Sequence, residues 1–577
     1  MQNGQNGQNG QKDFVDATSR RAAAGSAALL FKQVWLEPYC DKDDLFKKVE
    51  EAIGRGGDDR LYANTFLEQL VAEFGGGSRG RSSGTGTGGG TGGATPGGKN
   101  DSGGRAGGYH DEVRKVFQND GRNGLMRCFE FGSVGVMAGE ASGCRVLSEV
   151  CGWDWNPSAS IGRLSFSDNK PKTAITPPAQ WREFLLTPSL YSTVFSLVLS
   201  PRHTQHKHLV PELRKLLLQM ASFKGDGLFP KEDDGKGRME YAKAMLDGVC
   251  GMWHSLTAEG GGLENGAFEN ACFDICAISE RLSKNLGLEI MSKLGGFQDF
   301  LRGIATMAEQ MYKGVAEAVQ NVFDGDLEML VGSEEWKLDC YDMLTSSIAY
   351  LVDDTDSITA ETVNSISAVY KNFIVGRLMI SRAEERRNAV LGTDLDEVRE
   401  DIAEDELNEQ LITISQIGRV DLLSSLTILV EAFTNTLNNL KSLFSGVVGG
   451  GTNTGVVTPD AAALLEEARI LIMAMGFLMT DANDGESPAI PAIILQINLR
   501  QPNCAVALQS MVGLLIQLGQ HQATQIRATP DDPNLSPYLA HTILWFFSRF
   551  VPPYIIPDKT LYSSNLTTNN SLLELFR

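Results

Sequence analysis

One stretch near the end of the chain, ARILIMAMGFLMTDANDGESPAIP over residues 468–491, constrains the fold most strongly. Its apolar residues recur at steps of three and four, which places them on one face of a helix. Thr458 can cap the start of this helix, Pro459 fits its first turn, and the polar turn after Met479 ends it. Because so apolar a helix is unstable alone in water, it requires partner helices that cover it. The residues on the predicted face are Leu464, Ala468, Leu471, Ile472, Met475, Leu478 and Met479.

Most of the chain repeats this pattern. From residue 109 to residue 577, apolar segments of roughly 12 to 20 residues alternate with short polar or Gly/Pro breaks, and strand-like alternation is scarce. Helix pairs at a spacing of about 40 residues are typical of HEAT and armadillo repeats. The sequence therefore predicts an all-α fold, a HEAT/armadillo-like helical-repeat superhelix (an α-solenoid). Two or three unrelated helical bundles are the alternative.

Shifts in composition divide the chain into segments. A Gln/Asn/Gly-rich start predicts disorder, and a glycine-rich stretch without core-forming residues predicts a flexible loop. The predicted segments are a disordered tail (1–19), N-terminal helical repeats (20–74), a Gly-rich loop (75–108) and further HEAT-like repeats (109–577), the last interrupted by an acidic loop (394–409) and a Gly-rich loop (447–457).

Net charge and cysteine usage narrow the class of protein. The 577 residues carry a formal net charge of -21, which argues against nucleic-acid binding, since that requires a basic surface. An acidic protein suits cationic partners. The nine cysteines are scattered, mostly in apolar helical segments, so we expect buried thiols in a reducing compartment. Residues 1–12 are polar, and no apolar run is long enough for membrane insertion, so we expect an intracellular protein.

One glycine-rich motif has the spacing of a phosphate-binding loop. Residues 93–99 read GATPGGK, but Asn100 stands where a magnesium-binding Ser or Thr is needed. No strand pattern precedes the motif and no helix pattern follows it, so its backbone amides would not converge on a phosphate. We therefore expect no nucleotide site and no cofactor there.

Three histidines and a cysteine pair have the composition of a metal site without its surroundings. His203, His206 and His208 lie on a polar connector without a cysteine or carboxylate at ligand spacing, and Cys272 and Cys276 lie on an apolar helix. The polar turn after the apolar helix lacks the glycine and glutamate that an EF-hand loop needs at its sixth and twelfth positions. No nucleophile–base motif or carboxylate pair stands out. We expect no metal site and no enzyme activity.

The acidic run DLDEVREDIAEDELNE over residues 394–409 is the candidate binding segment. Such a run can attract a basic partner, although many acidic runs are simply solvated loops. The candidate partner-binding residues are Asp394, Asp396, Glu397, Glu400, Asp401, Glu404, Asp405 and Glu406.

Several segments together resemble one family. LIMAMGFLMTDANDGESPAIP (residues 471–491) is similar to the exportin-4 family, within the importin-β (karyopherin) superfamily, in which an apolar helix runs into a T-D-D-x-x-G-E-x-P-x-I-P turn. Other segments match the family in the same order along the chain. They are ALLFKQVWLE (28–37), VRKVFQ (113–118), GWDWNPS (152–158), QWREFLL (180–186), LLLQMASFKGDGLFP (216–230), residues 334–354, ISQIGRVDLLSSLTILVEAF (414–433) and SPYLAHTILWFFSRFVPPYIIPDKTLY (536–562).

The resemblance implies a nuclear export receptor without enzymatic activity. Such receptors carry protein cargo, including the hypusine-bearing translation factor, through the nuclear pore with GTP-bound Ran. They contact Phe-Gly nucleoporins and shuttle between nucleus and cytoplasm. The chain starts directly before the segment at Trp35 and stops at Arg577, so the resemblance implies a partial receptor. The alternative is a helical-repeat scaffold or adaptor without transport activity, such as a phosphatase regulatory subunit.

Overall fold

The computed structural model describes most of the chain. The described residues are 5–75, 112–120, 124–155, 174–199, 208–231, 235–258, 265–321, 327–352, 357–391, 401–447, 458–481, 487–501, 503–528, 536–558, Tyr562 and Leu572. Across these ranges the chain is helical, with β-structure limited to two isolated bridges, Ile175–Phe223 and Asp481–Ala489. The all-α prediction is confirmed. In the same ranges, no helix is long and apolar enough to cross a membrane.

The chain divides into two compact units, and the first spans Met1–Ser255. In this unit α3 packs against α1, α2, α5 and α6, and α6 packs against α5 and α10. Trp35, Phe74 and Phe117 form an aromatic core with ring centroids 4.3–5.3 Å apart. The helices of unit 1 are α1 (Gln5–Val34), α2 (Lys42–Arg55), α3 (Gly57–Gly75), a helix over residues 112–119, α5 (Leu125–Met137), α6 (Ala141–Cys151), α8 (Arg182–Leu185), α9 (Pro188–Val198), α10 (Leu209–Met220) and the start of α11 (Lys236–Ala258).

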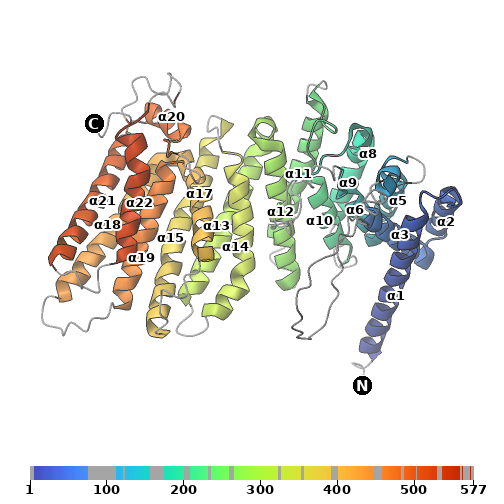
Figure 1. Ribbon diagram of the computed structural model, residues 1–577, viewed down its shortest axis with the longest axis horizontal. Coiled ribbons are helices and arrows are strands. Elements are labelled where there is room, and N and C mark those ends of the chain that lie inside the picture. Colours follow the sequence, from blue (N-terminus) through green and yellow to red (C-terminus); the bar gives the residue numbers. More distant parts are fainter. Residues whose placement is uncertain are drawn as a thin grey trace, which may run out of the picture. The chain divides into compact units, whose positions relative to one another are not determined.

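The second unit, Leu256–Arg577, is a stack of helices in two layers. In one layer α13, α15, α19 and α22 are successive neighbours, and in the other α14 packs on α12 and α17, and α21 on α18 (Figure 1). This neighbour-to-neighbour stacking is that of a helical-repeat protein, as predicted. The helices of unit 2 are α12 (Asn265–Met291), α13 (Phe297–Asn321), α14 (Leu327–Ala349), α15 (Ala360–Leu391), α17 (Asp401–Gly418), α18 (Leu422–Val447), α19 (Pro459–Met479), α20 (Ala492–Arg500), α21 (Asn503–Ala528) and α22 (Pro537–Tyr554).

Helix α19 is the most deeply buried element of unit 2. The Thr458 side chain caps it by accepting a hydrogen bond from the Ala461 amide (3.3 Å), and Pro459 occupies its first turn, as predicted. The sequence predicts one apolar face, but 16 of its 21 residues are buried. The reason is position, because α15, α17, α18 and α22 all pack against it. Because these neighbours lie on several sides of α19, they also bury residues outside the predicted apolar face.

A buried arginine binds the last carbonyl groups of α19. Arg419 lies in the short 3-10 turn between α17 and α18, and its guanidinium donates to the carbonyls of Leu478 (2.9 Å) and Phe477 (2.7 Å). It also pairs with the Asp481 carboxylate at 2.7 Å. The Tyr554 hydroxyl donates to the Met479 carbonyl (2.8 Å). The last carbonyls of a helix lack partners within it, so these contacts satisfy them.

Two predicted irregular segments are partly helical. Helix α1 begins at Gln5, so it includes residues 5–19, where the composition predicts a disordered tail. Helix α17 begins at Asp401, so residues 401–409 are helical where an acidic loop was predicted. Once one part of a helix is held by packing, adding residues to it costs little, because each new residue gains a hydrogen bond. The Gly-rich loops lie almost wholly outside the described residues: only Gly75, which ends α3, and Val447, which ends α18, are inside them.

Candidate partner-binding surface

The first turns of α17 carry the described part of the predicted acidic segment. Asp394, Asp396, Glu397 and Glu400 lie outside the described residues, and so do the side chains of Asp401 and Glu404. Asp405 and Glu406 are described, and both side chains are exposed.

Packing of α17 on α14 adds carboxylates that were not predicted. Asp342 of α14 is partly buried, and Gln410 of α17 donates to its two carboxylate oxygens at 3.2 and 3.3 Å. Asp339 lies on the same helix, and Glu406 and Glu409 lie on α17 close enough to act on the Asp342 charge. The structure therefore joins acids that are about 65 residues apart in sequence. We call Asp339, Asp342, Asp405, Glu406 and Glu409 the α14–α17 acidic cluster.

Burial raises the pKa of Asp342 to about 6, from an ordinary value of 3.8. This value includes the hydrogen bond from Gln410, which lowers the pKa, and the negative charges of Asp339, Glu406 and Glu409, which raise it. The ionised form of this carboxyl group is disfavoured mainly by partial burial and, to a smaller extent, by the neighbouring negative charges. A cation placed over the cluster would lower that cost, so the arrangement favours contact with basic groups.

The acids of α14 were missed because their sequence spacing carries no signal. The segment EEWKLDCYD over residues 334–342 reads as an ordinary amphipathic helix. Only the pairing of α14 with α17 brings Asp339 and Asp342 next to Glu406 and Glu409. Long-range helix packing of this kind cannot be read from the local pattern.

Apart from the cysteine pair, the other candidate motifs fall partly or wholly outside the described residues. His208 is exposed at the start of α10, whereas His203, His206 and the GATPGGK motif lie outside the described residues. Cys272 and Cys276 are buried on α12, where Cys276 hydrogen-bonds to Cys340 of α14, as expected for core thiols. Among the residues that the structure describes, no group of three or more His, Cys, Asp or Glu side chains could hold a metal ion.

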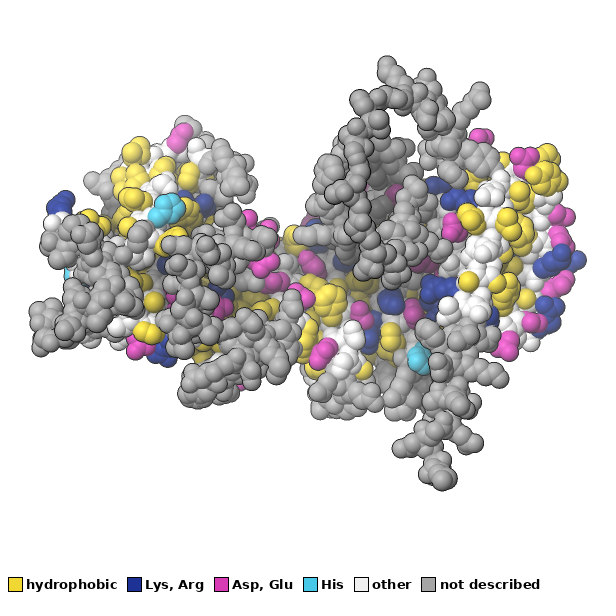
Figure 2. All heavy atoms as spheres, turned by 60° about the horizontal axis from the view of Figure 1, so that its bottom comes forward, with side chains coloured by type: hydrophobic (Ala, Val, Ile, Leu, Met, Phe, Trp, Pro, Cys, Tyr) yellow, Lys and Arg dark blue, Asp and Glu magenta, His cyan; other side chains and the backbone are white. Residues whose placement is uncertain are grey.

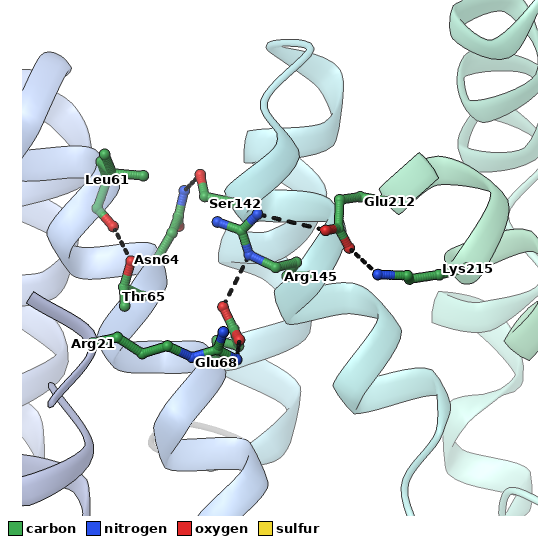
Figure 3. A network of polar contacts seen from close by, with 9 residues as sticks. All are labelled: Arg21, Leu61, Asn64, Thr65, Glu68, Ser142, Arg145, Glu212 and Lys215. Atoms are coloured by element: carbon green, nitrogen blue, oxygen red, sulfur yellow. Dashed lines mark hydrogen bonds and ion pairs between the residues drawn. The ribbon is translucent and has the colours of Figure 1, made fainter. Parts of the chain in front are cut away.

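Unit 1 contains a polar network that the sequence does not reveal (Figure 3). Glu68 of α3 is 5% exposed and pairs with Arg21 of α1 (2.7 Å) and Arg145 of α6 (3.0 Å). Arg145 also reaches Glu212 of α10 at 3.8 Å, and Glu212 reaches Lys215 at 3.7 Å. A buried carboxylate is costly unless it is paired, so this network selects one arrangement of four helices. The network joins α1, α3, α6 and α10.

Two comparisons with known proteins give a match to this chain. The family model described as Exportin-4 matches residues 143–576, which is most of the chain. Exportin-4 of Dictyostelium discoideum is 24% identical over 278 residues. That alignment covers 42% of this chain but only 22% of the relative, so the chain corresponds to a limited part of that protein.

Proposed function

Since the chain belongs to the exportin-4 family of nuclear transport receptors, we propose that it takes part in carrying protein cargo through the nuclear pore together with GTP-bound Ran. The observation that carries this proposal is the family match over residues 143–576, which spans α6 to α22. The proposed role is that of a binding protein without enzymatic activity, moving between nucleus and cytoplasm. Phe-Gly nucleoporins are its proposed contacts within the pore.

The helical-repeat fold supports this proposal physically. Each helix pair of unit 2 contacts mainly its neighbours, so small changes at successive contacts can add up to a change in curvature. Ran-GTP can strengthen cargo binding only if both partners favour the same conformation of the receptor. A stack with many small, similar interfaces can supply such alternative conformations.

The α14–α17 acidic cluster is the proposed contact for a basic surface of the partner. The cluster carries exposed carboxylates beside a partly buried one, in a chain whose formal net charge is -21. Opposite charges at the rim of an interface raise the rate of encounter and disfavour partners with the wrong charge. Binding through this surface should therefore weaken as the salt concentration rises.

A capture experiment with Ran tests the proposal. The immobilised chain is incubated with Ran locked in its GTP-bound form or with Ran bound to GDP, with and without a nuclear extract as the source of cargo. We expect preferential recovery of the GTP-bound form, increased by cargo. Equal recovery of both nucleotide states would contradict the transport proposal and would favour a helical-repeat scaffold.

Charge reversal tests the proposed contact in the same assay. Asp405→Lys with Glu406→Lys should reduce capture of the partner at least about fivefold at low salt, and less at high salt, since screening removes the same attraction. The matched control is Asp43→Lys with Asp44→Lys, which changes the net charge equally in the first turn of α2. An equal loss with the control would assign the effect to net charge and would overturn the role of the cluster.

A further inference from the structure

Helices α15, α18 and α19 of unit 2 border a cleft of about 460 Å³. Helix α15 lines it with Arg382 and Arg386, and α18 lines it with Asn439 and Ser442. Helix α19 adds Asp460 and two apolar residues. We call the space between these five polar side chains the arginine cleft. Four of the five carry N–H or O–H donors, so the cleft suits a ligand rich in acceptor oxygens.

A buried ion pair fixes Arg382 in this lining. Glu467 of α19 is 2% exposed, and its Oε1 atom accepts a hydrogen bond from Nε of Arg382 at 2.6 Å. Nη2 of Arg382 lies 2.5 Å from the same oxygen, and Thr436 of α18 donates to the other oxygen at 3.2 Å. Because a buried carboxylate is costly unless it is paired, this network restrains the Arg382 guanidinium before any ligand arrives.

Arg386 lies one turn further along α15 and is held in the same way. Its Nε and Nη2 atoms lie 3.0 and 2.8 Å from Oδ1 of Asp460. The Arg382 and Arg386 side chains are still 44% and 55% exposed, and their contacts with the two carboxylates involve the Nε–Nη2 edge. Since a guanidinium has five N–H donors, each arginine keeps donors for a second anion.

The arginine cleft contrasts with the charge of the whole chain. The sequence has 72 acidic and 51 basic residues, and Figure 2 shows acidic side chains spread over the face that it displays. Among the described residues that line the cleft, one is acidic and two are arginines. An anion that the overall charge repels can therefore be held here by cationic donors.

A phosphomonoester fits this lining better than a carboxylate does. A phosphomonoester carries a charge of about −1.5 to −2 at pH 7 and three acceptor oxygens, whereas a carboxylate carries one charge and two oxygens. Arginine pairs with phosphate through two parallel N–H donors. The volume of about 460 Å³ also exceeds that of a phosphate group alone, so the cleft has room for part of the molecule that carries it.

We propose that the arginine cleft binds a phosphomonoester group, with Arg382 and Arg386 pairing with its oxygens and with Asn439 and Ser442 donating further hydrogen bonds. Asp460 opposes this binding, since it repels the anion and occupies one edge of Arg386. A phosphorylated side chain of a partner protein and a small phosphorylated metabolite carry the same group. The proposal rests on the cleft alone and does not depend on a role in nuclear transport.

Isothermal titration calorimetry on the purified chain tests this proposal. The probes are a peptide with one phosphoserine among uncharged residues, the same peptide with glutamate at that position, and glycerol 3-phosphate. We expect saturable binding of the phosphorylated probes, and binding of the glutamate peptide that is at least about tenfold weaker. A phosphopeptide that binds at least about tenfold more tightly than glycerol 3-phosphate would identify a phosphorylated protein as the source of the group. Similar affinities would identify a small metabolite.

Two substitutions should change the affinity in opposite directions. Arg386→Gln should weaken binding of the phosphorylated probes at least about tenfold, because it removes one of the two cations. Asp460→Asn should strengthen binding at least about threefold, because it removes the competing carboxylate. Arg386 is chosen rather than Arg382, whose loss would leave the buried Glu467 carboxylate without its cation.

Arg527→Gln is the matched control, because it removes one positive charge from an exposed side chain in the last turn of α21, also in unit 2. This variant should bind the phosphorylated probes as the unchanged chain does. The proposal is overturned by an absence of saturable binding, by an equal loss in Arg527→Gln, or by equally tight binding of the glutamate peptide. Unchanged or weaker binding in Asp460→Asn would also overturn it. Since misfolding cannot strengthen binding, Asp460→Asn tests the site even where Arg386→Gln is destabilised.

Discussion

At the scale of single residues, the pKa of a side chain depends on its burial as well as on its residue type. Asp342 and Asp405 are both carboxylates of the α14–α17 acidic cluster, but Asp405 is exposed and Asp342 is partly buried. Burial disfavours the charged form of an acid, so the Asp342 pKa is raised to about 6. An acid whose pKa is higher in the folded state than in the unfolded state takes up protons when the chain folds. The Asp342 carboxyl group therefore contributes fully to the stability of the folded protein below its unfolded pKa near 4. This contribution is lost as the pH rises through the folded pKa of about 6.

Replacing Asp342 removes the free-energy cost of ionising a partly buried carboxyl group at neutral pH. We expect Asp342→Asn to stabilise the protein at pH 7 by about 1–2 kcal/mol, less than the full shift implies because the carboxylate is partly solvated. The asparagine oxygen keeps an acceptor for Gln410. Urea unfolding between pH 4 and pH 7 measures the effect, and the advantage of the variant should fade toward pH 4. Asp405→Asn is the control, and a pH-independent difference for Asp342→Asn would contradict the proposed cause.

At the scale of elements, close approach of helices depends on residues without side chains. In the α5–α6 hairpin, a Cβ atom added to Gly143 would lie 2.6 Å from the Gly135 Cα and 2.7 Å from the Gly135 carbonyl carbon. Both atoms belong to the backbone, so no side chain can move aside. The two helices touch through these glycines, and this contact positions α6 for the Glu68–Arg145 pair.

We therefore expect Gly143→Ala to force α5 and α6 apart and to destabilise unit 1 by about 2–3 kcal/mol. Gly54→Ala in α2 is the matched control, because an added Cβ there meets nothing within 4 Å. That change should be neutral or stabilising by up to about 1 kcal/mol, since alanine is the better helix former. Chemical denaturation followed by tryptophan fluorescence compares the two variants. Equal effects would show that the glycine contact is not the determinant.

At the scale of the whole molecule, two compact units predict stability that varies along the chain. Arg419→Ala would leave the Leu478 and Phe477 carbonyls and the Asp481 carboxylate without their partner. We expect a loss of about 2–4 kcal/mol. Hydrogen exchange should show faster exchange in α17–α22 of unit 2 and unchanged protection in α3 and α6 of unit 1. Arg55→Ala, which removes an exposed ion pair with Asp59, is the control. Uniform loss of protection would mean that the units unfold together.

Local patterns in the sequence were enough to identify the helices and the family. The spacing of apolar residues predicts α19, and its Thr458–Pro459 start is confirmed. The same spacing, repeated along the chain, identifies the helical-repeat class, and the resemblance to exportin-4 is confirmed by the family match. These features are readable because periodicity, caps and short motifs involve residues within a few turns of each other. The partner-binding role of the acidic segment stays a prediction.

Tertiary structure alone decided which distant residues meet. The sequence determined that α19 is apolar, but only the stack buries it on several sides and places Arg419 at its end. The sequence showed an acidic run, but only the α14–α17 contact adds Asp339 and Asp342 to it. Apolar patterning specifies that a helix must be covered without specifying which helix covers it. Which helix covers it depends on the shapes of the side chains and on ion pairs between residues that lie tens of positions apart in the sequence. These contacts form only in the folded chain.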